Sequence, residues 1–444
     1  MSNHSPTERT SSHLKQFFSD LSDVFKSHRK ELIYLGLIAA LILFSYSVAR
    51  GPSESLFLKH HHRSHLPGLW IEMGLAAMLL VALYNRLLNY LSLYQVFHLS
   101  FVMTATIFGL LLTDQFHFEE QTILIFGQAF PVGSVTLLRI WCDLYIVLLV
   151  ETFWSLSNLH FNFKSATLIY GFLGMAGSLG SMAGNMITAF YAQSWGTHFL
   201  IVLAVPSALL MSLCLWPLRH SLSMGEKIQK PSNTSSSFME GIKVICQSKY
   251  LPLILLLVLS SQVAVTLIDY QYKGLLQTLF PDVNDRSAIQ GWVYLSIDIG
   301  SILMQVLTGL TLTLIGVGAT LTMIPLLLLC LCMVPIFTPI FMMIAMGKSA
   351  SKVFTYSIFK SAKELVYLPL SYAEQTQGKA LIDIMVYRQA KLLASVILIV
   401  ISAQEVSVQA SGWYTVIAIL VWLFISSRLW IKLKHDSHSV ERNL

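Results

Sequence analysis

Charged residues are scarce in this sequence of 444 residues. Only 12% of them are Asp, Glu, Lys or Arg, whereas 55% are hydrophobic, and an average soluble domain carries about 25% charged residues. This scarcity excludes an ordinary soluble fold. The composition therefore indicates a chain that is embedded in a membrane.

Cysteine is also rare, and the cysteines have no metal-ligand spacing. In a helix, residues 330 and 332 point to different faces. We therefore expect no disulfide framework, no metal site and no cofactor, and we expect every cysteine to be a small core residue. The five cysteines are Cys142, Cys214, Cys246, Cys330 and Cys332.

Two further signals are missing. Residues 1–30 are polar and contain no apolar core of a signal peptide, so we expect the first apolar stretch to insert uncleaved. Gly347-Lys348-Ser349 lacks the earlier glycine of a nucleotide-hydrolysing phosphate loop, which argues against ATP hydrolysis as the driving force. The net charge of +6 comes mainly from basic residues beside the apolar stretches, so nucleic acid is not an expected partner.

What the sequence does contain is a series of apolar stretches about 20 residues long, the length a helix needs to cross a membrane. Because an unpaired backbone amide in hydrocarbon costs several kcal/mol, each stretch must be a helix. The twelve predicted spans are 31–50, 68–88, 94–113, 133–157, 166–190, 197–217, 251–273, 288–312, 315–336, 338–360, 379–402 and 412–433.

One polar segment divides these spans into halves. We predict an all-α integral membrane protein with twelve transmembrane helices in two six-helix bundles, 31–217 and 251–434, as in major-facilitator transporters. Residues 1–30, the linker 218–250 and the tail 435–444 are basic, so we expect them in the cytoplasm.

A histidine-rich loop and a glycine-rich span are two further features of the sequence. The outer loop 59–63 reads Lys-His-His-His-Arg, and we expect it to be solvated because consecutive histidines rarely converge on one metal ion. The fifth span carries a strip of small residues, where we expect another helix to approach closely. The strip consists of Gly171, Gly174, Gly177, Gly180 and Gly184.

Ionisable side chains inside the spans are the best pointers to function, because each costs about 2.5–3.5 kcal/mol on insertion scales. Arg139 and Asp143 are spaced i,i+4, as are Asp269 and Lys273, so each pair can form an internal ion pair. Such pairs could hold helices in register or modulate the charge of a substrate site. Glu151 lies two turns after Asp143.

The tenth and eleventh spans hold more cations than acids. Lys348, Lys352, Arg388 and Lys391 face only Asp383, so an anionic substrate could supply the missing neutralisation. The alternative is that these side chains lie at a cytoplasmic mouth and extend toward lipid headgroups.

Three stretches resemble the bacterial and plastid-type ATP/ADP translocase family of nucleotide transporters. The most specific reads YSIF at 356–359, KELVYLPL at 363–370 and GKA at 378–380, followed by Asp383, Arg388 and Lys391. The second reads DYQYK at 269–273 and FPDVND at 280–285, and the third reads FSYSVAR at 44–50. Ser53 stands where the family has a first-helix lysine, and we expect it near the substrate.

The resemblance implies a secondary transporter that moves a nucleotide, of the ATP/ADP type or a related phosphorylated metabolite, by alternating access. The alternatives are a carrier for another organic anion, or a transporter-like protein without transport activity. An enzyme is not expected. We further expect a bacterial inner-membrane location, contact with lipid, and a functional monomer.

The predicted site combines the charges of the spans with those of the resemblance. Three acidic residues are expected to modulate the charge of the site: Asp143, Glu151 and Asp383. The predicted substrate-binding residues are Arg50, Asp269, Lys273, Lys348, Lys352, Arg388 and Lys391.

Overall fold

The computed structural model describes most of the chain, and nearly all described residues are helical. The described residues are 26–113, 118–125, 128–161, 163–219, 238–337, 340–367, 370–371, 374, 379, 381–382, 387–402 and 411–441. In the first half the helices are α2 (Arg29–His60), α3 (Leu66–Leu87), α4 (Leu93–Leu111), α5 (Ser134–His160), α6 (Phe163–Trp195), α7 (Thr197–Val202) and α8 (Ala204–Leu215).

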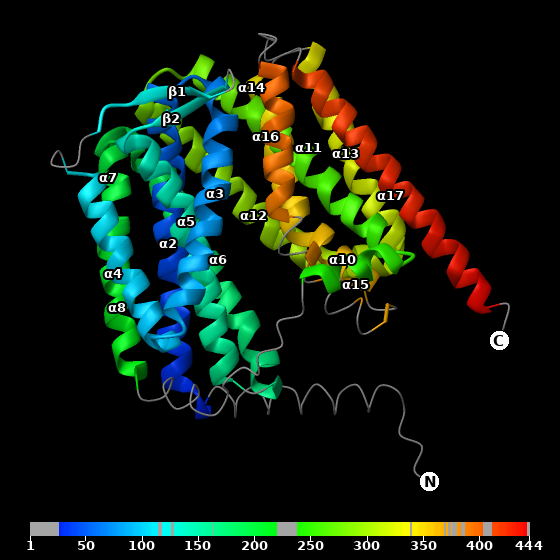
Figure 1. Ribbon diagram of the computed structural model, residues 1–444, viewed down its shortest axis with the longest axis horizontal. Helices are drawn as coiled ribbons and strands as arrows, with labels where there is room; N and C mark the ends of the chain where they lie inside the picture. The colour runs from blue at the N-terminus through cyan, green and yellow to red at the C-terminus, as the bar shows by residue number, and fades with distance from the viewer. Residues whose placement is uncertain are drawn as a thin grey trace.

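The second half begins with the amphipathic α10 (Phe238–Gln247). The other helices are α11 (Leu251–Leu279), α12 (Val283–Ile315), α13 (Val317–Phe337), α14 (Phe341–Phe354), α15 (Lys360–Tyr367), α16 (Tyr387–Ser402) and α17 (Ser411–Glu441). Figure 1 shows the first-half helices on the left and the later ones on the right, with the start of α2 and the end of α17 toward the bottom.

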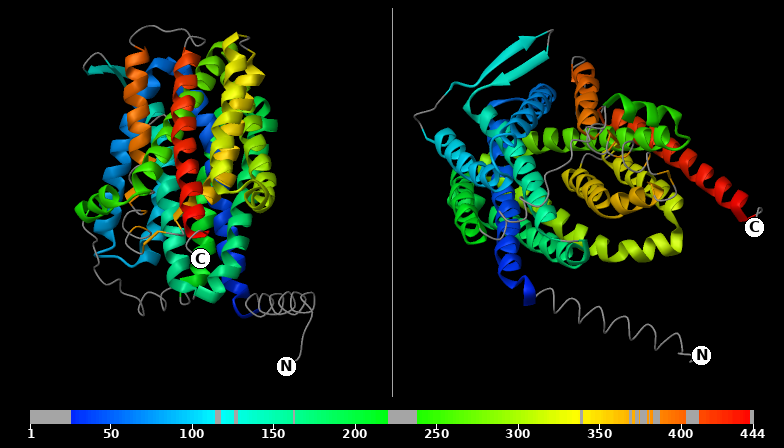
Figure 2. Two further views of the ribbon diagram at one scale, coloured as in Figure 1. Left: turned by 90° about the vertical axis from the view of Figure 1, so that its right-hand side faces the viewer. Right: turned by 60° about the horizontal axis from the view of Figure 1, so that its bottom comes forward.

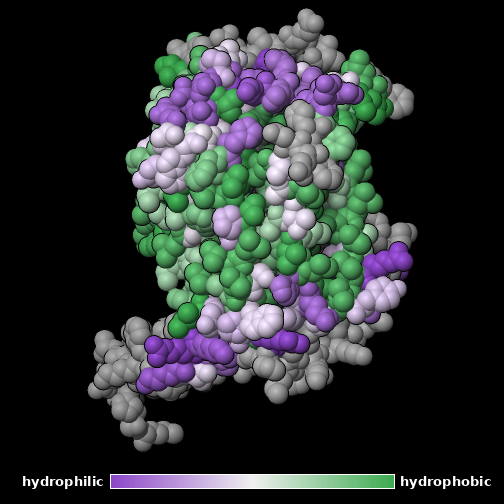
Figure 3. All heavy atoms as spheres, turned by 90° about the vertical axis from the view of Figure 1, so that its left-hand side faces the viewer, coloured by the Kyte–Doolittle hydropathy of each residue, from purple (hydrophilic) through white to green (hydrophobic). Residues whose placement is uncertain are grey.

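Among the described residues, eight helical segments are long and apolar enough to cross a membrane. These are Arg29–His60, Arg63–Leu88, Leu93–Leu111, Thr197–Leu218, Leu251–Leu279, Val283–Ile315, Val317–Phe337 and Ser411–His435. On the face shown in Figure 3, hydrophobic side chains fill a belt between two hydrophilic bands, as a bilayer requires. The chain is thus an all-helical membrane protein with several spans.

Each half has its own hydrophobic core. One buried cluster draws its members from Leu32 to Leu218, and a second draws its members from Ile245 to Leu429. A smaller cluster joins α2 and α3 to α11 and α16, and includes Trp70 and Leu398. The two cores therefore meet along a contact that both halves supply.

The first helix is longer than predicted. We expected it to end at residue 50, but α2 continues to His60 with Pro52 inside it. Pro52 has no N–H, so the helix lacks the backbone hydrogen bond from residue 52 to Val48 O, and side chains of α12 bind other carbonyls of the extension. Here Gln290 Nε2 donates to Gly51 O at 3.2 Å, and Arg286 Nη1 donates to Ser55 O at 3.0 Å. Residues 51–58 of the extension are buried, and these two bonds join the extension to α12.

The glycine strip on α6 packs against α2 over part of its length. A Cβ at Gly180 would lie 2.0 Å from Ala40 O, and one at Gly184 would lie 2.7 Å from Phe44 O. Gly171 and Gly174 have nothing within 4 Å of their Cβ positions. The expected close approach is confirmed for the C-terminal part of the strip only.

A short hairpin, β1 (Gln121–Ile125) and β2 (Gln128–Val132), lies between α4 and α5 in the chain. It projects from the helices at the end opposite the start of α2 (Figure 2). Glu120 at its base accepts hydrogen bonds from Val135 N at 2.6 Å and Thr136 Oγ1 at 2.9 Å, and contacts His61 Nε2 at 2.8 Å. Burial raises the pKa of Glu120, but these bonds outweigh it and hold the pKa below its usual value.

The prediction of a solvated histidine loop is therefore wrong for His61, which is buried. Among the described residues, no group of three or more acidic, histidine or cysteine side chains could hold a metal ion. The prediction of five core cysteines is also wrong for two of them, since Cys246 and Cys330 are exposed. The exposed Cys330 lies on an apolar helix, where small side chains can face lipid as readily as a core.

Candidate functional site

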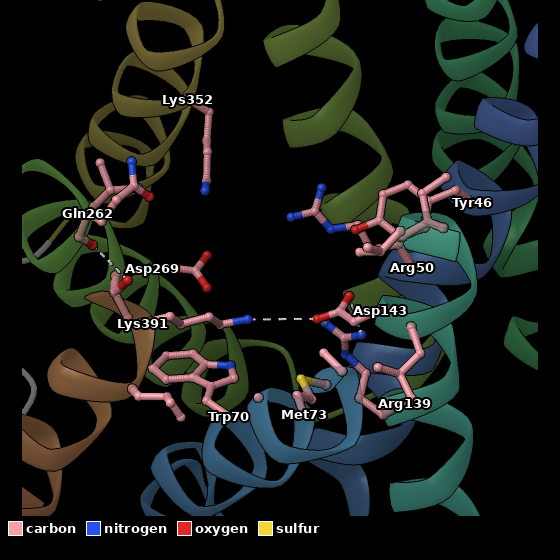
Figure 4. Close-up of a pocket in the computed structure, with 18 of the residues that line it drawn as sticks. Tyr46, Arg50, Trp70, Met73, Arg139, Asp143, Gln262, Asp269, Lys352 and Lys391 are labelled. Carbon is pink, nitrogen blue, oxygen red and sulfur yellow. Dashed lines mark hydrogen bonds and ion pairs between the residues drawn. The ribbon is translucent and has the colours of Figure 1, made fainter. Parts of the chain in front are cut away.

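A cavity of about 360 Å³ lies between the halves. Its walls come from α2, α3 and α5 on one side, and from α11, α14 and α16 on the other, together with the π-helical turn η4 (Thr355–Phe359) between α14 and α15. Figure 4 shows that charged side chains of both halves point into it. We call this cavity the central chamber.

The central chamber is lined by more cations than anions. Asp143 and Asp269 are its carboxylates. Its five cations are Arg50, Arg139, Lys273, Lys352 and Lys391. Since uncompensated charge inside a membrane is costly, this excess favours an anionic occupant.

Glu54 of α2 lies outside the chamber lining and bridges two of its cations, Arg139 and Lys273. Its Oε2 lies 3.5 Å from Arg139 Nη2 and 3.3 Å from Lys273 Nζ, and its side chain is buried. Arg139 also pairs with Asp143 at 2.9 Å, and Lys273 pairs with Asp269 at 2.8 Å. Both i,i+4 pairs predicted from the sequence are thus present, and a buried acid of α2 links them.

Lys348 and Lys391 are neutralised from other helices. Lys348 Nζ lies 2.5 Å from Asp269 Oδ1 and is buried, outside the chamber lining. Lys391 Nζ reaches 3.8 Å from Asp143 Oδ2, an ion pair that crosses the chamber from α16 to α5 (Figure 4). The sequence could not show these pairs, because the partners are 79 and 248 residues away.

Arg50 and Lys352 are different. Neither has a carboxylate within 4.0 Å among the described residues. The Arg50 guanidinium lies 4.3 Å from the centroid of the Tyr294 ring, and Lys352 Nζ lies 5.7 Å from that of Tyr356. Aromatic faces hold these two cations while leaving their hydrogen-bond donors available.

Two of the predicted site residues, Lys348 and Glu151, lie outside the chamber lining. Six of the ten line it: Arg50, Asp143, Asp269, Lys273, Lys352 and Lys391. Glu151 is exposed on α5 and is not part of the lining. The side chain of Arg388, and Asp383 as a whole, lie outside the described residues.

Sequence reasoning also missed some lining residues. Tyr46 and Tyr356 both lie inside stretches that carry the family resemblance, which was the available signal. Tyr356 sits in the π-helical turn, a feature that often marks functional sites. The centroid of the Trp70 ring lies 5.1 Å from Lys273 Nζ and 5.7 Å from Lys391 Nζ. Nothing in the sequence around Trp70 marks it as a site residue.

Ser53 does not line the chamber as we expected. It is completely buried, and its hydroxyl donates to Arg50 O at 3.0 Å. The helix continues past residue 50, so position 53 turns away from the cavity into the packing with α5.

Beyond the chamber, toward the hairpin, hydrogen bonds join the halves. Gln277 of α11 donates from Nε2 to Leu58 O at 2.7 Å and to His61 O at 2.8 Å, and its Oε1 accepts from Arg63 N at 2.9 Å. Arg286 and Gln290 of α12 add the bonds to α2 described above. We call this set the hairpin-end latch.

Comparison with known proteins places the chain in a family. The family model described as TLC ATP/ADP transporter matches residues 7–338 and 330–432. ADP,ATP carrier protein 3 of Rickettsia conorii is 23% identical over 489 residues, covering 94% of this chain and 96% of that protein. The chloroplastic ADP,ATP carrier protein 1 of Arabidopsis thaliana is 22% identical over 411 residues, and the match spans 65% of its length.

Solved structures show the fold. The nucleoside transporter NupG superposes with a TM-score of 0.64 at 10% identity, covering 91% of this chain and 98% of that one. A bacterial homolog of the human lysosomal transporter Spinster, in an inward-facing and unoccupied conformation, superposes with a TM-score of 0.55 at 13% identity. The match covers 93% of this chain and 98% of that one. The fold is therefore major facilitator-like, and these relatives are transporters rather than enzymes. With the resemblance of the signature stretches confirmed by the match along the chain, the protein belongs to the TLC ATP/ADP transporter family.

Proposed function

We propose that this protein is a secondary transporter that carries a nucleotide across a membrane by alternating access. The observation that carries the proposal is the chamber, where five cations face two carboxylates between the two halves. Phosphate groups satisfy such a site, because they accept bidentate bonds from Arg and single strong bonds from Lys. The names of the relatives, ADP,ATP carrier proteins, favour a nucleotide over other phosphorylated anions.

The overall architecture supports movement of two rigid halves. We infer twelve transmembrane helices in two six-helix bundles, 31–217 and 251–434, since each predicted span overlaps a helical segment. Several of the described helices do not meet the length and hydropathy expected of a membrane span. They include the charged α5, the glycine-rich α6 and the short α14 and α16. These are also helices that face the chamber or the other half.

The arrangement corresponds to one state of the transport cycle. The hairpin-end latch closes one side of the chamber, while the two groups of helices diverge toward the end at which α2 begins (Figure 1). With residues 1–30, 218–250 and 435–444 in the cytoplasm, the chamber faces inward. Opening the latch and closing the opposite end would expose the same site to the other side.

The location and assembly follow from the same reasoning. We infer a bacterial inner membrane, because relatives occur in Rickettsia and Chlamydia. Lipid surrounds the apolar belt, and one chain supplies both walls of the chamber, so a monomer is sufficient for transport.

The test is uptake of labelled ATP and ADP by proteoliposomes that contain the purified protein, with and without unlabelled nucleotide inside. We expect saturable uptake that is inhibited by unlabelled nucleotide outside. Sugar phosphates and nucleosides should inhibit it only weakly. The matched control is the double variant Arg50→Ala/Lys352→Ala, which should reconstitute equally well and take up little label. If correctly reconstituted wild-type protein moves no nucleotide, the proposal is wrong.

A further inference from the structure

We propose that a side pocket of the central chamber is the subsite for the terminal phosphoryl group of the nucleotide, and that Asp298 sets the charge which this subsite accepts. The inference rests on the proposed function. It adds a position for one end of the substrate and assigns a role to a carboxylate that the chamber itself does not use.

The side pocket is small and opens beside the chamber. Its volume is about 50 Å³, and it shares Tyr46, Arg50, Lys352 and Tyr356 with the chamber lining. Its remaining walls come from α2, α6 and α12, so both halves contribute. A phosphoryl group fits a space of this size, whereas a purine with its ribose does not.

The cations at the entrance to the pocket are the two that have no acidic partner. Arg50 and Lys352 line both cavities. Arg50 Nε is buried and has no hydrogen-bond partner. A buried donor on a cation is well placed to bind a strong acceptor that enters the pocket. The acceptor that suits a guanidinium edge is a phosphate oxygen.

The rest of the wall is polar. Ser47 Oγ and Ser181 Oγ lie 3.0 Å apart, and Asn185 lies one turn further along α6. These groups make the wall polar and hydrogen-bond to one another, so Arg50 and Lys352 are the groups that would bind phosphate oxygens, and Ile297 is the aliphatic member of the lining. The larger chamber has Trp70, Met73 and Leu392 in its wall, which suits the base and ribose.

Asp298 is the acid of this pocket. Its Oδ2 accepts from Ser181 Oγ and from Asn185 Nδ2, each at 2.8 Å, so two neutral donors of α6 hold it in place. No cation lies within 4.0 Å of it among the described residues. Arg50 and Lys352 against Asp298 leave the pocket with one net positive charge, which is too little for a fully ionised terminal phosphate. The carboxylate therefore disfavours each additional negative charge that enters.

The experiment is Asp298→Asn in proteoliposomes, with KM measured for AMP, ADP and ATP. Asn keeps an oxygen for the two donors of α6 but removes the negative charge. With the base in the central chamber, the phosphate chain of ATP reaches the side pocket and that of AMP does not. Removing the negative charge therefore favours ATP, and we expect the ATP-to-AMP ratio of kcat/KM to rise about three- to tenfold. Glu72→Gln, a carboxylate on α3 outside both cavities, is the matched control and should leave the ratio unchanged.

A second variant guards against misfolding. Lys352→Gln removes a cation from the same pocket, so the ATP-to-AMP ratio should fall. Folded Asp298→Asn and Lys352→Gln proteins that transport nucleotides with the wild-type ratio would overturn the subsite while leaving the proposed function intact. Absence of any nucleotide transport by wild-type protein contradicts the proposed function instead.

Discussion

At the scale of single residues, the site depends on which cations are already neutralised. Lys348 forms an ion pair with Asp269, and Lys273 forms ion pairs with both Asp269 and Glu54. Arg50 and Lys352 contact aromatic rings instead. The capacity to bind an anion therefore belongs to a subset of the cations that the sequence displays.

Lys391 belongs to this subset because the one ion pair it forms with a described residue, Asp143, is long at 3.8 Å. We expect Lys391→Ala to reduce nucleotide uptake at least about tenfold, because a charge-assisted bond to phosphate is worth about 1.5–3 kcal/mol. The measurement is initial uptake rate at equal reconstituted protein. Arg86→Ala, an exposed cation at the end of α3, is the control and should behave as wild type. Unchanged uptake in Lys391→Ala would place the anion elsewhere.

Ser53 provides the second residue-scale prediction. From the sequence, Ser53→Lys should shift preference toward substrates with more phosphates, but the buried position predicts a different result. A lysine there would bury an ammonium, which we expect to destabilise the protein by about 3 kcal/mol or more. The thermal unfolding midpoint in detergent should fall clearly, whereas Ser53→Ala should change it little. A stable Ser53→Lys protein with altered phosphate preference would show that position 53 reaches the substrate.

At the scale of elements, two helices depend on close backbone approach. Gly180→Ala should lower the unfolding midpoint, because its Cβ would lie 2.0 Å from Ala40 O and backbone must move. Gly171→Ala, on the same helix with nothing within 4 Å, should leave stability equal or slightly raised, since Ala favours helix by about 1 kcal/mol over Gly. Equal destabilisation of both variants would argue against this packing.

The sequence predicted where helices exist, because apolar length determines this, but it did not predict where α2 ends, because local packing determines that. Helix existence follows from hydrocarbon thickness, so all the predicted spans overlap helical segments. The continuation of α2 through Gly51 and Pro52 was missed because this pair normally ends a helix in water. Contacts from Arg286 and Gln290 of α12 stabilise the extension, and those residues are more than 230 positions away.

At the scale of the whole molecule, the hairpin-end latch should control which side the chamber faces. Gln277→Ala removes three hydrogen bonds between the halves, each worth about 1 kcal/mol, so the population open at the hairpin end should rise. The measurement is labelling of Thr266→Cys, a chamber residue, by an impermeant maleimide added outside intact cells.

The background for this measurement carries Ser at Cys246 and Cys330, the two exposed cysteines. Gln95→Ala, which removes a capping bond within α4 only, is the control and should not change the labelling rate. Labelling that is equally slow in Gln277→Ala and the parent would mean that the latch does not hold this end closed.

The sequence alone determined that the chain is helical and membrane-embedded, because apolar length and charge scarcity leave no other way to satisfy the backbone in lipid. It also supplied six of the chamber residues, since ionisable groups inside spans are too costly to be incidental. Only the tertiary structure decided which charges neutralise one another, because ion pairing depends on distances between helices that are far apart in the chain. For the same reason it alone showed that Arg50 and Lys352 have no carboxylate within 4.0 Å among the described residues, and that Asp298 lies in a pocket beside them.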